Sequence, residues 1–167
     1  MATYYLMIGA PAAGKSFYVE EFRRAGCVVV SPDDIRDKHR VSAQESYALA
    51  KQQIIEALRT GEDVVLDATN VKPVSRLLSI QAGKPYAKRI VGVWLDTPFD
   101  LCVRRHRERL TKGPISARYA TEKLYEEVIK EYCQILEENP PQLSEGFDEI
   151  RRIASNPPVS KREPHRR

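Results

Sequence analysis

The chain has 167 residues, 42% hydrophobic and 30% charged, which fits one globular domain and excludes a disordered chain. Its net charge is +4, but the segment from Ser155 onward carries four basic residues against one acidic residue, so the nearly neutral remainder excludes a broadly basic nucleic-acid-binding surface. The sequence has no apolar run near the roughly 18 residues of a membrane span and no paired spacing among its three cysteines. Its first residues lack the basic and apolar pattern of a secretory leader, so we expect no signal peptide. These features predict a cytoplasmic protein with reduced thiols and no membrane contact.

Strand and helix patterns alternate along the sequence. Short apolar runs rich in β-branched residues predict strands, and apolar residues at helical spacing predict the helices between them. In chain order we expect a strand at 3–8, a helix at 15–25, a strand at 27–31, a short helix from 33, a long helix at 42–60, a strand at 63–67, a helix at 72–82, a strand at 88–96, a helix from 98 to about 110, a long helix from about 117 to 138 and an edge strand at 149–153.

This alternation indicates the α/β class. The prediction is a mostly parallel sheet of four to five strands covered by helices on both faces, with ligands at the carboxyl ends of the strands. Residues 1–154 form the predicted domain, with a helical lid at about 104–116. Residues 155–167 are rich in proline and charge, and we expect them to form a flexible basic tail.

A phosphate-binding motif follows the first predicted strand. Residues 9–16 read GAPAAGKS, which matches the pattern G-x-x-x-x-G-K-[ST] between a strand and a helix. In such a loop the backbone N–H groups and the helix N-terminus bind phosphate, Lys15 reaches the β- and γ-phosphates, and Ser16 is a ligand of Mg²⁺. The alternative is a glycine-rich turn without a ligand. The motif in this context favours a site for ATP or another NTP with Mg²⁺.

The third predicted strand restricts what happens to the γ-phosphate. It ends at Asp67, a carboxylate that is able to hold Mg²⁺, and Ala68 stands where a water-activating ATPase has a glutamate. The sequence also has no N-K-x-D element for guanine recognition. We therefore expect phosphoryl transfer to a bound acceptor rather than NTP hydrolysis.

The second predicted strand supplies candidates for the acceptor side. It leads into Asp33, Asp34 and Arg36, beside the phosphate loop. A carboxylate at this place is suited to orient a hydroxyl and take its proton, and an arginine is suited to bind a phosphate of the acceptor. The alternative is that Ser31 or Asp33 only caps the following helix.

A basic cluster lies in the predicted lid. It comprises Arg104, Arg105, Arg107, Arg109 and Lys112, directly before a Gly-Pro break at 113–114. A mobile arginine that stabilises the charge of a phosphoryl-transfer transition state is worth about 10³ to 10⁵ in rate. The alternative is a solvated basic helix, but we expect at least one of these residues to contact the nucleotide.

Other aromatic and imidazole side chains give weaker signals. Tyr119, Tyr125 and Tyr132 are expected to face the core or its boundary rather than to stack on bases. Tyr47 has no usable spacing, and exposure is the expectation for His106.

With these elements together, the sequence resembles the P-loop 5′-hydroxyl polynucleotide kinases over most of residues 3–153. The segments that carry the resemblance are GAPAAGKS, SPDDIR, DATN, LDTP and RRHRERLTKGP. The resemblance implies a P-loop kinase fold, with Asp33 as the general base that activates a 5′-hydroxyl. It also implies that Arg36 contacts the 3′-phosphate of the acceptor and that Arg109 engages the donor phosphates. The sequence departs from the family at Ala12 and Ala13, where Gly-Ser is common.

The complete predicted site follows from these motifs. The predicted catalytic residues are Lys15, Asp33 and Arg109; the acceptor-binding residues are Asp34, Arg36, Thr69 and Asn70; the nucleotide-binding residues are Gly9, Ala12, Ala13, Gly14, Lys15, Ser16, Phe17, Arg105 and Arg109; and the Mg²⁺ ligands are Ser16 and Asp67.

Three functions are compatible with this site. The leading hypothesis is transfer of the ATP γ-phosphate to 5′-OH ends of RNA or DNA, in the cytoplasm of a bacterium or of a phage-infected cell. The alternatives are a P-loop kinase of a small metabolite such as a nucleoside or nucleotide, and a nucleotide-binding module without acceptor chemistry. The sequence indicates no protein partner.

Overall fold

The computed structural model describes residues 2–112 and 122–155. The elements in chain order are β1 (Thr3–Ile8), α1 (Lys15–Arg24), β2 (Val28–Val30), α2 (Pro32–His39), α3 (Ala43–Arg59), β3 (Val64–Leu66), α4 (Pro73–Gly83), β4 (Arg89–Asp96), α5 (Phe99–Thr111), α6 (Glu122–Glu138), the 3₁₀ helix η2 (Leu143–Glu145) and β5 (Glu149–Ala154). All predicted strands and helices are present. The end of the predicted lid, the start of the last predicted helix and the predicted tail from residue 156 lie outside the described residues.

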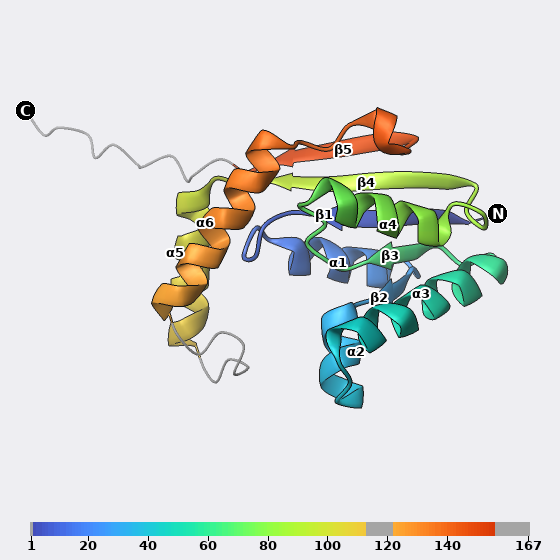
Figure 1. Cartoon of the computed structure of the whole chain (residues 1–167), viewed down its shortest axis with the longest axis horizontal. Coiled ribbons are helices and arrows are strands. Elements are labelled where there is room, and N and C mark those ends of the chain that lie inside the picture. The colour runs from blue at the N-terminus through green and yellow to red at the C-terminus, as the bar shows by residue number, and fades with distance from the viewer. Residues whose placement is uncertain (1, 113–121, 156–167) are drawn as a thin grey trace, which may run out of the picture.

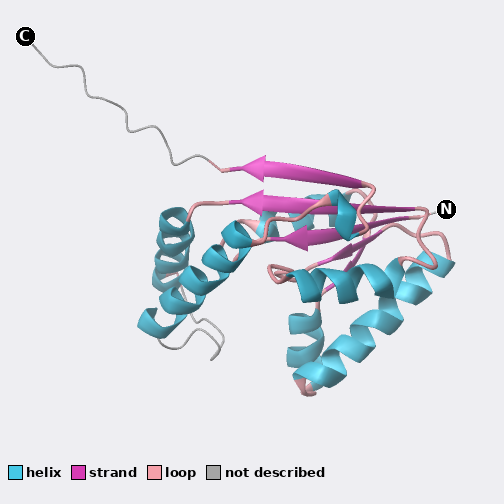
Figure 2. Cartoon of the chain, turned by 45° about the horizontal axis from the view of Figure 1, so that its top comes forward, coloured by secondary structure: helices cyan, strands magenta, loops and turns pink. Residues whose placement is uncertain are grey.

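The five strands form one parallel sheet in the order β2-β3-β1-β4-β5 (Figure 1). Parallel strands place their carboxyl ends at one edge, and the loops after β1, β2 and β3 therefore meet there. The helical pair α5–α6 stands beyond the carboxyl ends of β4 and β5, apart from the pair α2–α3 in both ribbon views (Figures 1 and 2). This arrangement places the P-loop centrally, with the segment after β2 and the helix α5 after β4 on opposite sides of it.

Alternation along β1 explains the two layers of the core. Tyr4, Leu6 and Ile8 belong to a cluster with buried residues of α3 and α4, whereas Met7 belongs to a second cluster with residues of α1 and α5. Helix α6 contributes to both clusters, through Leu136 and Ile129 respectively. Helices thus cover both faces of the sheet, as predicted.

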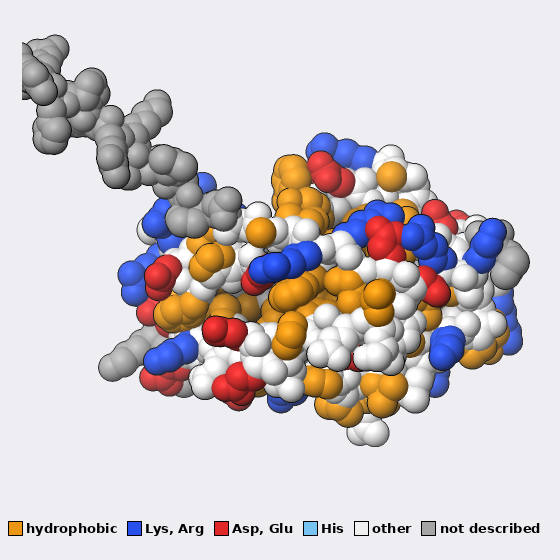
Figure 3. Space-filling model, turned by 90° about the horizontal axis from the view of Figure 1, so that it is seen from above, with side chains coloured by type: hydrophobic (Ala, Val, Ile, Leu, Met, Phe, Trp, Pro, Cys, Tyr) orange, Lys and Arg blue, Asp and Glu red, His pale blue; other side chains and the backbone are white. Residues whose placement is uncertain are grey.

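Arginines at the β5 edge of the sheet are ion-paired. There Arg151 pairs with Glu149 at 2.7 Å, Arg89 pairs with the same carboxylate, and Arg152 pairs with Asp96. Seen from above, basic and acidic side chains are interspersed with apolar ones rather than gathered into one basic surface (Figure 3).

Across the described ranges 2–112 and 122–155, none of the helices has both the length and the apolar character required to cross a membrane.

Candidate active site

The P-loop joins β1 to α1 and is hydrogen-bonded to the loop after β3. The N–H of Gly9 donates to the carbonyl of Thr69 at 2.9 Å, and the N–H of Ala13 donates to the carbonyl of Ala10 at 3.1 Å. The backbone has positive φ at Ala12 (63°) and at Gly14 (104°). A side chain at residue 14 is disfavoured by the positive φ, and an added Cβ, 3.0 Å from the guanidinium of Arg105, would also require that guanidinium to shift.

Lys15 folds back onto this loop. Its ammonium donates to the carbonyls of Gly9 and Ala10, both at 2.8 Å. Burial lowers the pKa of Lys15 to about 8; the negative charge of Asp67 opposes this shift and the positive charge of Arg109 adds to it. A bound polyphosphate offers the lysine a stronger negative partner than two carbonyls, so phosphate binding favours its charged form.

A cavity of about 360 Å³, here called the central pocket, opens above the P-loop. It is lined from four regions: the P-loop, the start of α2, the loop after β3 and the helices α5 and α6. Its lining residues are Pro11, Ala12, Gly14, Lys15, Ser16, Ser31, Asp33, Asp34, Asp37, Asp67, Ala68, Thr69, Arg109 and Tyr125. The structure therefore brings together nine residues of the predicted site: Ala12, Gly14, Lys15, Ser16, Asp33, Asp34, Asp67, Thr69 and Arg109.

The start of α2 explains how carboxylates reach the pocket. Ser31 is the N-cap residue, and its hydroxyl accepts the N–H of Asp34 at 3.3 Å. The capping alternative therefore holds for Ser31, while Asp33 lines the pocket from the first turn of the helix. Arg36 lies one turn further and donates to Asp33 at 3.2 Å. It does not line the central pocket itself but approaches it through this ion pair.

The oxygen atoms available at the pocket fit Mg²⁺. Burial raises the pKa of Asp67, the nearby charges of Asp34 and Asp33 raise it further, and Lys15 opposes them. Mg²⁺ is commonly held in proteins by one or two oxygen side chains together with water and phosphate oxygens. The Ser16 hydroxyl and the Asp67 carboxylate are such a pair. A cation at this place also reduces the repulsion between the pocket carboxylates and an incoming polyphosphate.

Asn70 has a different place from the one predicted. It is only 4% exposed, with φ at 47°, and does not line the central pocket. Its amide donates to the carbonyl of Met7 at 2.9 Å and accepts from the hydroxyl of Ser79 at 2.8 Å. The prediction that Asn70 binds the acceptor is therefore replaced by a structural role, in which it ties the loop after β3 to β1 and α4.

Helix α5 contacts the P-loop through Arg105. Its guanidinium donates to the carbonyl of Ala13 at 2.8 Å, and the hydroxyl of Thr97 donates to the same oxygen at 2.9 Å. Beside this contact lies a second cavity of about 460 Å³, here called the lid pocket, whose lining includes Phe17, Lys112 and Arg109. Arg109 thus borders both pockets, and Phe17 is 65% exposed next to the P-loop.

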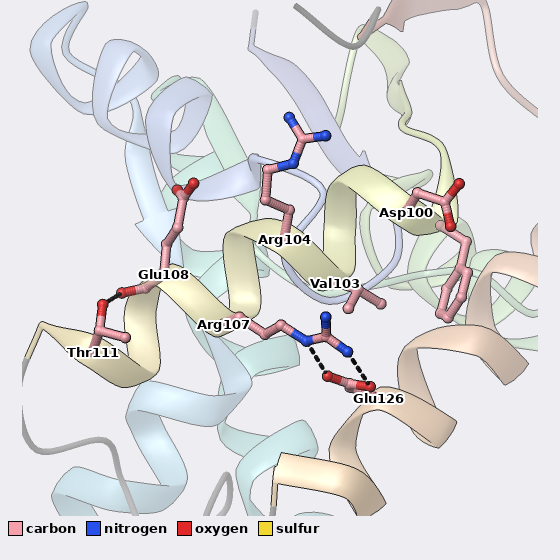
Figure 4. A pocket seen from close by; sticks show the side chains of 8 residues that line it. Asp100, Val103, Arg104, Arg107, Glu108, Thr111 and Glu126 are labelled. Carbon is pink, nitrogen blue, oxygen red and sulfur yellow. Dashed lines mark hydrogen bonds and ion pairs between the residues drawn. The ribbon is translucent and has the colours of Figure 1, made fainter.

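Arg104 and Arg107 of the basic cluster line neither the central pocket nor the lid pocket. Arg104 and Arg107 line a cavity between α5 and α6 (Figure 4). Arg107 forms two hydrogen bonds with Glu126 of α6, at 2.6 and 3.1 Å. The cluster therefore divides: Arg105, Arg109 and Lys112 border the lid pocket. Arg107 instead joins α5 to α6 through Glu126, and the Arg104 side chain points away from α6 (Figure 4).

Several residues at the site were missed by the sequence reasoning. Asp37 and Tyr125 line the central pocket, and Thr97 fixes the P-loop. The signal for Asp37 was its place four residues after Asp33, on the same helical face. His106 was expected to be exposed but is 3% exposed, with its ring 4.5 Å from that of Tyr125.

Comparison with known proteins identifies the family. Residues 5–138 match AAA_33, a family described as an AAA domain, so the chain belongs to this P-loop family. It is also 25% identical over 150 residues to a protein of Acanthamoeba polyphaga mimivirus that is named as a bifunctional polynucleotide phosphatase/kinase. That match covers 89% of this chain and 32% of the viral protein. The resemblance to polynucleotide kinases is thus confirmed.

Solved structures share the fold. A chain of the Pnkp1/Rnl/Hen1 RNA repair complex superposes with a TM-score of 0.69 at 23% identity, covering 82% of this chain and 44% of the other. A gluconokinase from Sinorhizobium meliloti 1021 superposes with a TM-score of 0.57 at 14% identity, covering 93% and 84%. The P-loop kinase fold is therefore confirmed, and the chain spans less than half the length of its polynucleotide-processing relatives.

Proposed function

We propose that this chain is an ATP-dependent kinase that transfers the γ-phosphate to the 5′-hydroxyl end of RNA or DNA. The observation that carries the proposal is the place of Asp33, which lines the same pocket as Lys15 and is ion-paired to Arg36. A phosphate-binding lysine, a carboxylate base and an acceptor-side arginine are the groups that phosphorylation of a nucleotide end requires.

The donor is bound by the P-loop. Lys15 and the backbone N–H groups of the loop bind the β- and γ-phosphates, and Ser16 and Asp67 would hold Mg²⁺. When bound, Mg²⁺ supplies positive charge to the phosphate oxygens. Arg105 and Arg109 approach from the lid helix, where Arg109 is able to contact the transferred phosphoryl group and Arg105 fixes the loop.

The chemical step uses Asp33 as the general base. Asp33 takes the proton of the 5′-hydroxyl while that oxygen forms a bond to the γ-phosphorus. The bond from the γ-phosphorus to the bridging oxygen of the β-phosphate breaks, and ADP leaves with that oxygen. Positioning and charge stabilisation supply most of the catalysis in such transfers.

The acceptor is held on the α2 side. Arg36 exchanges its contact with Asp33 for the 3′-phosphate of the terminal nucleotide, a geometry that suits a guanidinium. Asp34 and Thr69 line the pocket beside the base. The named activity of the viral relative supports this acceptor class.

Organisation and location follow from the same proposal. In this proposal residues 1–154 act as the kinase domain, and the protein works in the cytoplasm. The repair-complex relative suggests that protein partners are worth testing.

The experiment is transfer of radioactive γ-phosphate from ATP in the presence of Mg²⁺. The acceptors are a 5′-OH RNA oligonucleotide, a 5′-OH DNA oligonucleotide, a 3′-mononucleotide, and a panel of nucleosides, nucleoside monophosphates and gluconate. Asp33→Asn should lower turnover on oligonucleotides by roughly 10² to 10⁴ while ATP binding is kept. Asp34→Asn and Asp37→Asn are matched controls, because both residues lie on the same helix and line the same pocket, and they should lose less.

The outcomes separate the candidate functions. Labelled oligonucleotides whose formation depends on Asp33 support the proposal. Label on a small acceptor alone overturns it in favour of a metabolite kinase, and ATP binding without any transfer overturns it in favour of a binding module.

A further inference from the structure

Tyr47 is exposed beside the acceptor side of the central pocket. Helices α2 and α3 are joined by three residues, 40–42, so they form a hairpin in which the second turn of α3 lies beside α2. A capping box between Ser42 and Glu45 fixes the start of α3, with both hydrogen bonds at 3.1 Å. Tyr47 follows in this turn and is 60% exposed.

The neighbours of Tyr47 come from both walls of the site. Its phenol interacts electrostatically with Asp33 and Arg36 of α2 and with Tyr132 of α6. Burial of the phenol oxygen, together with the charge of Asp33, raises the pKa of Tyr47, and Arg36 opposes this. The hydroxyl therefore lies within electrostatic range of Asp33 and Arg36, while the residue as a whole is 60% exposed.

Two exposed aromatic rings lie near this site, one on the donor side and one on the acceptor side. Among the described residues, the large hydrophobic side chains that are exposed include two aromatic rings, Phe17 and Tyr47. Phe17 borders the lid pocket on the donor side, and Tyr47 lies within electrostatic range of Asp33 and Arg36 on the acceptor side, on a helix packed against α2. Burying such rings is favourable, so each is a ready surface for a flat apolar partner.

The terminal nucleotide of the acceptor has three groups to place. Its 5′-hydroxyl goes to Asp33 and its 3′-phosphate to Arg36, and these two residues are in contact at 3.2 Å. The third group is the nucleobase, which leaves the same ribose. Stacking of a base on an aromatic ring is worth about 1–3 kcal/mol by alanine substitution and tolerates any base.

We infer that Tyr47 is the stacking surface for the 5′-terminal nucleobase of the acceptor, an inference that rests on the proposed function. In this inference the enzyme recognises the whole terminal nucleotide. Asp33 contacts its 5′-hydroxyl, Arg36 binds its 3′-phosphate, and Tyr47 stacks on its base. This recognition depends on the presence of a base and not on its identity.

The test compares two acceptors of equal length. One has a normal 5′-terminal nucleotide, and the other has an abasic 5′-terminal residue with the same 5′-OH and 3′-phosphate. The unmodified enzyme should use the abasic acceptor with a kcat/KM lower by roughly tenfold. Tyr47→Ala should lower kcat/KM on the normal acceptor to the same extent, mainly through KM, and should leave the abasic acceptor unaffected. Tyr47→Phe keeps the ring and should behave like the unmodified enzyme.

Controls exclude a structural effect. Leu78 is similarly exposed, at 62%, on α4, and Leu78→Ala should change neither acceptor. The KM for ATP and the thermal midpoint should be unchanged in Tyr47→Ala, and Tyr47→Leu, which keeps bulk without an aromatic face, should repeat its effect.

An unchanged preference for the normal over the abasic acceptor in Tyr47→Ala overturns the inference and leaves the proposed function intact. Absence of transfer to either oligonucleotide by the unmodified enzyme instead overturns the proposed function, and the inference with it.

Discussion

The guanidinium of Arg105 and the carbonyl of Ala13 are joined by a hydrogen bond of 2.8 Å across 92 residues of sequence. Thr97 donates to the same oxygen, so the loop before α5 and helix α5 itself both hold the P-loop. The carbonyl of Ala13 is thus fixed by two donors that lie 84 and 92 residues away in the sequence. These two contacts preorganise the P-loop in this structure.

Removing this contact should weaken ATP binding. A hydrogen bond from a charged donor is worth about 1.5–3 kcal/mol, so Arg105→Ala should raise the KM for ATP by roughly tenfold or more, with a smaller change in the KM for the acceptor. Arg104→Ala is the matched control, because Arg104 is exposed on the same helix and lines the cavity between α5 and α6. Steady-state kinetics in both substrates distinguish the two variants, and equal KM values for ATP would contradict the assigned role.

Loss of a Mg²⁺ ligand should appear as a raised metal requirement. With Asp67→Asn or Ser16→Ala, we expect the Mg²⁺ concentration for half-maximal activity at fixed ATP to rise by about tenfold, since each variant removes one of few protein ligands. Asp100→Asn, an exposed carboxylate in the first turn of α5, should leave the requirement as it is. If the Mg²⁺ titrations of all three variants coincide with that of the unmodified enzyme, the metal is held elsewhere.

Nucleotide affinity should fall in alkaline solution because of Lys15. Burial lowers the pKa of this lysine to about 8 in the free protein, and phosphate favours its charged form, so binding above pH 8 takes up a proton. Affinity should be constant below about pH 8 and decrease by up to about tenfold per pH unit above it.

Calorimetry at pH 8.5 in two buffers of different ionisation enthalpy measures the proton uptake directly. The thiol of Cys102, whose pKa is lowered by a hydrogen bond with Cys133, also interacts with Lys15. Cys102→Ser removes this second titratable group. If Lys15 is the group that titrates, this variant should retain the pH dependence of ATP affinity. Equal affinity at pH 7 and pH 9, without proton uptake, would show that Lys15 is not the titrating group.

Local patterns were sufficient to predict the fold. The strand at 3–8 was predicted with the bounds that it has, and the alternation of strands and helices gave a parallel sheet covered on both faces. The spacing of apolar residues, the glycines at helix ends and the eight-residue motif are each defined by a few neighbouring residues. The elements could therefore be predicted without knowledge of tertiary contacts.

Contacts between distant segments were not predictable in this way. Asn70 was assigned to the acceptor because it belongs to a motif, whereas its amide bonds to Met7, 63 residues away. The spacing of Arg104 and Arg105 says nothing about which of them faces the P-loop until α5 is packed on the sheet. The proposed role of Tyr47 likewise depends on the packing of α3 against α2, the helix that carries Asp33.

Arg76 is the strongest example of a residue that only the tertiary structure explains. It lies on α4, is 1% exposed, and its guanidinium donates to the carbonyls of Asn70, Val71 and Asn139 at 2.8–3.2 Å. It also pairs with Glu145 at 2.7 Å. It thereby joins the loop after β3, which carries pocket residues, to the end of α6.

Arg76→Met should therefore destabilise the protein strongly. Breaking a buried ion pair by removing one partner costs about 3–5 kcal/mol, which for a chain of this size lowers the thermal midpoint by roughly 10 °C. Arg59→Met is the matched control, because the guanidinium of Arg59 lies on the surface 4.9 Å from the ring of Tyr86, and it should cost less than about 1 kcal/mol. Urea denaturation of both variants, followed by circular dichroism, gives the two free energies of unfolding. Equal stability of Arg76→Met and Arg59→Met would mean that the carbonyls around residue 76 find other donors, and that Arg76 does not hold this loop.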